Sequence, residues 1–214
     1  CLGRLGDDAA TAHLLEHLDD PDLRGPAAQA LGELGLAGHA EAAIEPLSRA
    51  VEDASSSDAF ARAEATKALG SVARGHPGAG VDALCKALRL DPSSTVRAAA
   101  ARALGTVSAD PERIRPPLLA ALDDAEAVVR LDVIESLRGL PALHAAATPR
   151  LIALLDDPQD AVVEAAAEAL EELAPPSALA PLRALSEDSA RSQQVRQAAR
   201  RAALRLERSA PNAR

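Results

Sequence analysis

The sequence repeats itself at an interval of about 33 residues, and this feature constrains the fold more than any other. The string Ala-Leu-Gly occurs at 30–32, 68–70 and 103–105, and degenerate copies follow. Its leucine defines an anchor position in each copy, and the anchors are Leu2, Leu31, Leu69, Leu104, Leu137, Leu170 and, as the last, Ala203. Repeats of this length are small helical or mixed units that stack, because one unit alone cannot bury its apolar face.

Each repeat is predicted to contain two helices. A first segment ends near an acidic pair, as at Asp123-Asp124, and a second segment carries the anchor. Counted from the anchor, positions −8, −4, −1, 0 and +3 of the second segment are almost always apolar, whereas −2 and −5 fall on the opposite face. In the third repeat the apolar positions are Val96, Ala100, Ala103, Leu104 and Val107. This spacing is typical of a helix with one buried side, and the glycine after the anchor is expected to cap its carboxyl end.

We therefore expect an all-α fold, a right-handed α-α superhelix of about six helix pairs that forms a single solenoid over residues 1–214. A closed bundle is the alternative, but a period sustained over six copies favours the solenoid. The chain has one Phe and no Trp, Tyr or Met, so Ala, Leu, Val and Ile must build the core. Such small side chains let helices pack closely. The expected repeats span 7–37, 38–75, 76–109, 110–142, 143–174 and 175–209, between the end of a preceding repeat (1–6) and a tail (210–214).

The segment Asp-Pro-Ser-Ser-Thr-Val-Arg at 91–97, followed by the Ala-rich stretch that ends in Ala-Leu-Gly, resembles the HEAT repeat, especially the short form of phycobilisome-lyase-like proteins. The resemblance covers essentially the whole chain and implies a HEAT/armadillo-type solenoid. It also implies a hydrogen-bonded ladder between neighbouring repeats, made by a turn Asp and the Arg that follows it. By match, the structural ladder residues are Arg24, Arg62, Asp91, Arg97, Asp124, Arg130 and Arg196. The ladder should break in the fifth repeat, where Val163 stands six residues after Asp157.

Few residues point to catalysis. His13 and His17 lie four apart, a spacing that can hold a metal, but a third ligand is missing nearby and solvated helix residues are the better interpretation. Some HEAT-type enzymes bind di-iron through His-Glu dipeptides, and this sequence has none. Cys85 is expected to be a small, partly buried apolar residue. Phosphate loops, nucleophile elbows and paired-Cys zinc motifs are absent from the sequence, so we assign no catalytic, metal or cofactor-binding residue and expect a protein that is not an enzyme.

The charge distribution suggests a partner. The net charge is −9, which disfavours nucleic acid and anionic membranes. The last 25 residues carry a formal +6, which we interpret as a terminal cap, with the binding of an acidic partner as the alternative. Carboxylates concentrate on the second helices of the fourth and fifth repeats, at Asp132, Glu135, Glu164, Glu168, Glu171 and Glu172. They are either a solvated face or an acidic surface that binds a basic segment of a partner protein.

The leading hypothesis is thus a non-catalytic scaffold that binds a protein along the second helices, as a monomer or as part of a larger chain or complex. The rival, implied by the resemblance, is a bilin (tetrapyrrole) lyase or lyase chaperone, although Tyr and Trp, which would sandwich the ring, are absent. A designed consensus array is disfavoured by the irregular repeat lengths.

The start of the chain lies inside a motif, because residues 1–6 match residues 30–35. We interpret the chain as a fragment of a longer protein, with Cys1 as a lipidated first residue the alternative. Neither a signal peptide nor an apolar run of membrane-spanning length is visible, so a cytoplasmic location is expected.

Overall fold

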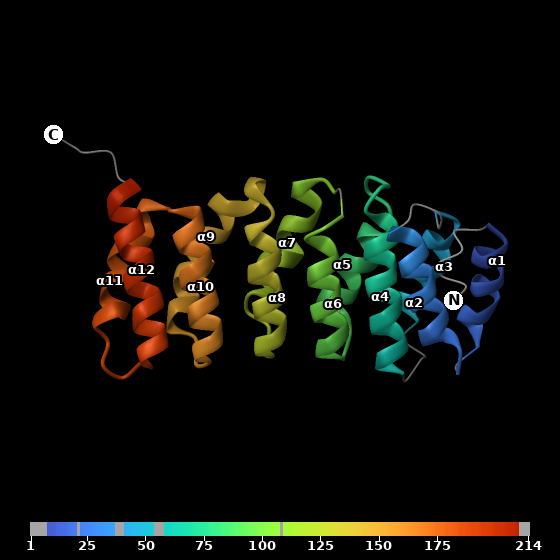
Figure 1. Cartoon of the computed structure of the whole chain (residues 1–214), viewed down its shortest axis with the longest axis horizontal. Helices are drawn as coiled ribbons and strands as arrows, with labels where there is room; N and C mark the ends of the chain where they lie inside the picture. Colours follow the sequence, from blue (N-terminus) through green and yellow to red (C-terminus); the bar gives the residue numbers. More distant parts are fainter. Residues whose placement is uncertain (1–7, 21, 37–40, 54–57, 108, 210–214) are drawn as a thin grey trace. The chain divides into compact units, whose positions relative to one another are not determined.

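The computed structural model describes residues 8–20, 22–36, 41–53, 58–107 and 109–209 (Figure 1). Within these ranges every regular element is a helix and no strand occurs. The expected all-α fold of repeated helix pairs is confirmed. Residues 1–7, and with them the interpretation of Cys1, lie outside the described residues.

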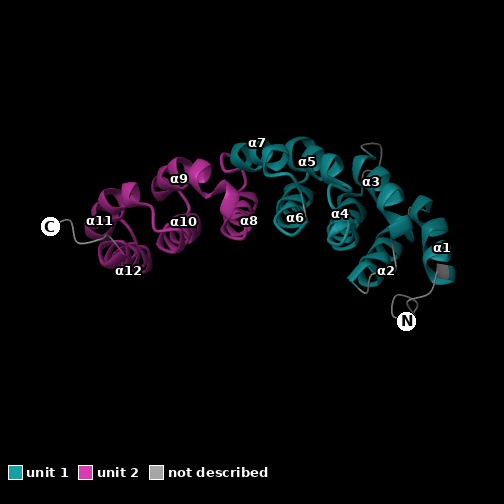
Figure 2. Ribbon diagram, turned by 90° about the horizontal axis from the view of Figure 1, so that it is seen from above, with its two compact units in different colours: residues 1–121 teal, residues 122–214 magenta. Residues whose placement is uncertain are grey.

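The chain separates into two compact units, residues 1–121 and 122–214 (Figure 2). The boundary falls inside the fourth expected repeat, 110–142, so a single solenoid over the whole chain stays a prediction.

In unit 1 the helices form two layers (Figure 2). The first helices of the repeats are α1 (Asp8–Glu16), α3 (Ile44–Glu52), α5 (Val81–Leu90) and α7 (Pro111–Ala121), with short 3₁₀ turns η2 (His17–Asp19) and η3 (Glu41–Ala43). The second helices are α2 (Arg24–Leu36), α4 (Ala59–Ala73) and α6 (Ser94–Leu104). Each second helix packs against the next one, α2 on α4 and α4 on α6, and against the first helix of its own repeat.

Unit 2 repeats this arrangement. Its second helices are α8 (Ala127–Arg138), α10 (Asp160–Leu173) and α12 (Gln193–Ser209). Its first helices are α9 (His144–Ala153) and α11 (Leu179–Glu187), with 3₁₀ turns η4 (Pro141–Leu143), η5 (Leu154–Asp156) and η6 (Pro176–Ala178). Helix α10 packs against α8, α9 and α12.

The anchor positions form the core of both units. Leu31, Leu69, Leu104, Leu137 and Leu170 are each at most 1% exposed. The predicted apolar stripe of α6 is buried throughout. The −5 position differs from the prediction in two repeats: Ala99 of the third and Ala198 of the last are buried, although this position is predicted to lie on the opposite face. The small side chain of Ala99, in the third repeat, lies at the bottom of a groove between α4 and α6.

The predicted cap is found at one of the three glycines that follow Leu31, Leu69 and Leu104, and the other two have a different role. Gly32 and Gly70 lie inside α2 and α4, and Gly105 alone ends its helix, without a left-handed φ. A Cβ on Gly70 would lie 2.6 Å from the Cβ of Ala103, so glycine is required for α4 to approach α6 this closely. At Gly32 and Gly70, the glycine of Ala-Leu-Gly therefore allows close packing against the second helix of the next repeat.

Candidate protein-binding surface and the arginine ladder

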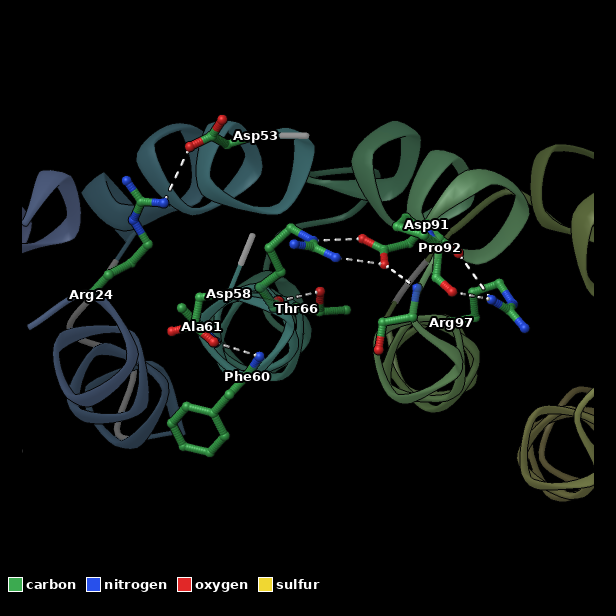
Figure 3. A network of polar contacts seen from close by, with 11 residues as sticks. Arg24, Asp53, Asp58, Phe60, Ala61, Thr66, Asp91, Pro92 and Arg97 are labelled. Carbon is green, nitrogen blue, oxygen red and sulfur yellow. Dashed lines mark hydrogen bonds and ion pairs between the residues drawn. The ribbon is translucent and has the colours of Figure 1, made fainter. Parts of the chain in front are cut away.

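Buried arginines join successive repeats in unit 1 (Figure 3). Arg62 of α4 donates from Nε and Nη2 to the two carboxylate oxygens of Asp91, at 2.8 and 3.0 Å, and both side chains are nearly inaccessible to solvent. Arg24 of α2 donates from Nη1 to Oδ2 of the partly exposed Asp53 at 3.1 Å, and from Nε to the carbonyl of Leu18 at 2.7 Å. In both pairs the aspartate lies 29 residues after the arginine, in the next repeat.

The arginine at this position of the repeat also donates hydrogen bonds to the turn that precedes its own helix. Arg97 donates to the carbonyl oxygens of Asp91 and Pro92, at 2.9 and 3.2 Å. Asp91 in turn accepts the backbone N–H of Ser93 at 2.8 Å. Asp91 thus accepts a hydrogen bond from Arg97 at its carbonyl, while its carboxylate binds Arg62 of the preceding repeat.

Unit 2 contains an equivalent pair, and we call each such pair of an arginine with the aspartate of the next repeat a rung of the ladder. Arg130 donates from Nη2 to Asp157 Oδ1 at 2.9 Å, and its Nε lies 2.8 Å from Oδ2. Its Nη1 donates to the carbonyl of Asp124 at 2.7 Å. Asp53 and Asp157 are therefore ladder residues that the sequence assignment missed. Their signal was present, because both are turn aspartates one repeat beyond a matched arginine.

The fifth repeat lacks the arginine, as Val163 is buried at its position. The carbonyl of Asp157 is not left unpaired, because Arg191 donates to it at 2.8 Å from the turn between α11 and α12. Arg191 also reaches Asp160 at 3.4 Å. Arg196, the last matched arginine, has a buried Nε without a hydrogen-bond partner within the described residues.

The predicted acidic residues lie on α8 and α10, where two arginines pair with most of them. Arg138 of α8 donates a hydrogen bond to Glu135 at 2.6 Å. It also forms a bidentate contact with Glu172 of α10. This contact lowers the pKa of Glu172 and raises that of Arg138, in both cases mainly through the hydrogen bond between them.

Arg201 of α12 neutralises a second pair of carboxylates. It lies 3.0 Å from both Glu168 and Glu171 of α10, and the bond to Glu171 is the main reason that its pKa is raised. Asp132 and Glu164 are half-buried, and Asp132 also takes part in a polar interaction. The six acids are thus brought onto two neighbouring helices, with Arg138 and Arg201 inserted among them. We call Asp132, Glu135, Glu164, Glu168, Glu171 and Glu172 the acidic surface.

The remaining candidates offer little chemistry. The Nε2 atoms of His13 and His17 lie 3.4 Å apart, with Glu16 3.8 Å from His13, and no cluster of three metal-binding side chains occurs in the described parts of the chain. Cys85 is buried in α5, and burial raises its thiol pKa, so it is a poor nucleophile. Among the helices of the described ranges, none combines the length and apolar character needed to cross a membrane.

Comparisons with known proteins agree with this architecture. The family model described as HEAT repeats matches residues 54–138 and 115–204. The chain is similar to the HEAT-like repeats protein of the archaeon Thermococcus onnurineus NA1 (TM-score 0.64, 17% identity, 94% of this chain and 88% of that one). It is also similar to the complex of CpcE and CpcF of phycocyanin lyase from Nostoc sp. PCC7120 (TM-score 0.59, 27% identity, 76% of this chain and 99% of that one).

A third similar structure is a designed armadillo repeat protein in complex with the peptide (KR)4 (TM-score 0.61, 21% identity, 91% of this chain and 98% of that one). The search of curated protein sequences gave no match.

Proposed function

The chain belongs to the HEAT-repeat family, and we propose that it is a non-catalytic scaffold that binds another protein along its second helices. The observation that carries this proposal is the row of carboxylates at equivalent positions of α8 and α10. Glu135 and Glu168 both stand at −2 from their anchors and are both exposed. A solenoid exposes such equivalent positions side by side, which creates an extended surface for a partner.

A basic segment of the partner fits this surface. Arg138 and Arg201 pair with four of the six carboxylates, and Arg205 lies near enough to Glu172 to lower its pKa. Asp132 has an interaction of its own, and the carboxylates still outnumber these three arginines. An excess of this kind accelerates the approach of a cationic segment and fixes its register. Armadillo-type folds accommodate basic peptides, as the designed protein in complex with (KR)4 illustrates.

A peptide titration tests the proposal. The probe is a fluorescent (Lys-Arg)4 peptide, and the test variant reverses Asp132, Glu164 and Glu168 to Lys. We expect the reversal to abolish binding at low salt, and circular dichroism verifies that each variant keeps its helices. The matched control reverses three exposed acids of the first-helix layer in unit 1 (Glu45, Asp82 and Glu112), which gives the same change in net charge. Binding that survives in the test variant, or is lost equally in the control, would place the interface elsewhere.

The alternative is a bilin lyase or lyase chaperone, which the likeness to the CpcE–CpcF complex favours. The absence of Trp and Tyr counts against it, because these side chains commonly stack on flat ring systems. Incubation with a free bilin distinguishes the two functions. A shifted visible absorption band that co-elutes with the protein would support the lyase, whereas an unchanged spectrum supports the scaffold.

A further inference from the structure

We infer that the solvent-exposed side of α12, in unit 2, binds an acidic amphipathic helix of a partner protein. Three arginines and one leucine carry this inference, and we call them the basic face: Arg196, Arg200, Leu204 and Arg208. None of them belongs to the acidic surface, and Arg201, which pairs with that surface, is not part of the basic face. Either site can therefore fail its test while the other stands.

The packing of unit 1 identifies the side of a second helix on which another helix can stack. A Cβ on Gly25, Gly32 or Gly35 of α2 would contact residues of α4. These glycines stand at −6, +1 and +4 from the anchor Leu31, and position −3 lies in the same row along the helix. On α12 the row is exposed throughout, and it consists of Gln197, Arg200, Leu204 and Glu207.

The chemistry of this row differs between α12 and the other second helices. Position −3 is at most 1% exposed in the other five, where it is Ala28, Thr66, Ala101, Ile134 or Ala167. In α12 the same position is Arg200, and it is exposed. An apolar helix stacked on this row would bury the guanidinium group without a partner, which is costly. A helix that brings a carboxylate to Arg200 avoids this cost.

The positive charges of the basic face are not neutralised by other described residues. Arg200 and Arg208 are exposed, and neither forms an ion pair within the described ranges. Arg196 is half-buried, and its Nε is a buried atom without a hydrogen-bond partner there. Glu207, the one carboxylate of the row, is held by Arg183 of α11 at 2.6 Å. Three positive charges therefore remain for a ligand.

An exposed leucine lies between two of these arginines. Leu204 is 50% exposed. It stands four residues after Arg200 and four before Arg208, so the three side chains follow one side of the helix. From Gln197 to Arg208 this side extends over about 16 Å, or three helical turns. The complementary ligand is a helix of similar length, with leucines on one side and carboxylates next to them.

A polar cap on the end of the repeat array is the other role that such a face can have. A cap requires polar side chains of either sign, and surfaces that serve solubility mix the two signs. The helix dipole accounts for Arg208, which lies in the last turn, but not for Arg200 in the middle of α12. Cations alone at the unpaired positions, in a chain of net charge −9, favour a negatively charged ligand.

The surroundings of the basic face fit an acidic peptide better than a nucleic acid. Glu168 and Glu171 of α10 lie beside α12, because both pair with Arg201, and carboxylates repel a long chain of phosphates. Proteins that hold single strands also present aromatic side chains on which bases stack. Helix α12 contains no aromatic residue.

Fluorescence anisotropy on the whole chain tests the inference at about 0.1 M salt. The probe is a labelled (Glu-Leu-Ala-Glu)4 peptide, and a second probe, (Glu-Ser-Ala-Glu)4, has the same charge without the leucines. The test variant is Arg200→Glu with Arg208→Glu, and Leu204→Ala tests the apolar contact. Circular dichroism verifies the fold of each variant, and the milder Arg200→Gln serves if the double variant unfolds.

The matched control is Arg74→Glu with Arg89→Glu, in unit 1. Both control arginines are exposed and, like Arg200 and Arg208, form no ion pair within the described ranges. Test and control variants therefore change the net charge equally, and neither breaks an ion pair of the described residues. They differ only in the place where the charge changes.

We expect the test variant to weaken binding of the leucine peptide about tenfold, because two favourable charge contacts become repulsive. The control variant should change it less than about twofold, since charges act over only about 10 Å at this salt concentration. Leu204→Ala should weaken the leucine peptide about threefold and leave the serine peptide unchanged.

Four outcomes would overturn the inference. The unaltered chain does not bind the leucine peptide, or the test variant binds it as tightly as the unaltered chain does. Equal weakening in test and control variants would show that net charge alone attracts the peptide. An oligouridylate that binds more tightly than either peptide, and is lost in the test variant, would assign the basic face to RNA. Unchanged binding of both peptides to Leu204→Ala would refute the apolar contact, and with it the amphipathic character of the ligand.

Discussion

At the scale of single residues, the sequence predicted the positions of the ladder arginines but only part of their hydrogen-bond partners. Their positions follow from the match to the repeat, since Arg24, Arg62, Arg97 and Arg130 all stand at −7 from an anchor. Their partners did not follow, because one arginine can bind two turns. Arg24 and Arg130 each donate to a carbonyl of their own turn and to the carboxylate of the next turn, as Arg130 does with Asp124 and Asp157. A single spacing of six residues describes only the first of these contacts.

Removal of one partner of a buried rung should be costly. Arg62→Met leaves Asp91 charged and covered, and such broken pairs typically cost about 3–5 kcal/mol. The control is Arg113→Met, whose ion pair with Asp82 is solvent-exposed and should contribute little to stability. Urea unfolding of both variants measures the difference. Equal losses of stability would mean that the rung is no stronger than a surface pair.

The contact of Arg138 with Glu172 predicts a titration. It lowers the carboxyl pKa, so it stabilises the folded protein above the unfolded pKa of Glu172. That contribution is lost as the pH falls through the folded-state value. In Arg138→Gln the pKa of Glu172 should rise toward its ordinary value, which NMR titration of the side-chain carboxyl carbon measures. An unchanged value would show that the pair does not form in solution.

At the scale of helices, the anchors located the core correctly because burial follows the helical period. Two features escaped that reasoning. The cap predicted for the glycines of Ala-Leu-Gly holds for Gly105, whereas Gly32 and Gly70 lie within helices where a neighbouring helix packs closely. Arg191 was not recognised as the substitute for the arginine missing at Val163, because it comes from a turn 34 residues after Asp157 and from a different register.

The buried stripe predicts a contrast within one helix. Leu104→Ala should destabilise the protein by about 2–5 kcal/mol, because it leaves a cavity in the core. Arg102→Ala, on the exposed face of the same helix, should cost less than about 1 kcal/mol. Thermal and urea unfolding measure both. Similar shifts for the two variants would show that the stripe is wrongly placed.

At the scale of the whole molecule, the period of the sequence predicted the fold class, and the charges predicted only part of the acidic surface. Spacings within one helix brought Glu164, Glu168, Glu171 and Glu172 together, but the arginines that neutralise them come from other repeats. Arg138 lies 34 residues before Glu172, and Arg201 lies 33 after Glu168. The period itself carried this signal, since residues one repeat apart face each other on neighbouring helices.

The fold class has a direct spectroscopic consequence. Because the described residues form helices and no strand, far-ultraviolet circular dichroism should give a helix-dominated spectrum without a sheet component. A substantial sheet signal in the folded protein would contradict the repeat assignment itself.

Because a ladder arginine can bind both its own turn and the turn of the next repeat, a repeat can be removed at any point of the period if the spacing between arginine and aspartate is kept. Excision of residues 32–69 joins Leu31 to Gly70, anchor to anchor, and places Arg24 the same 29 residues before Asp91 that now separate Arg62 from it. A gene that loses this segment should therefore still encode a helical, cooperatively unfolding protein. An excision two residues longer turns the joined helix by about 200° and should not. Calorimetry on the two shortened chains would test this, and equal behaviour would refute it. Such arrays can grow or shrink by recombination at any point of the repeat, provided that the register is kept.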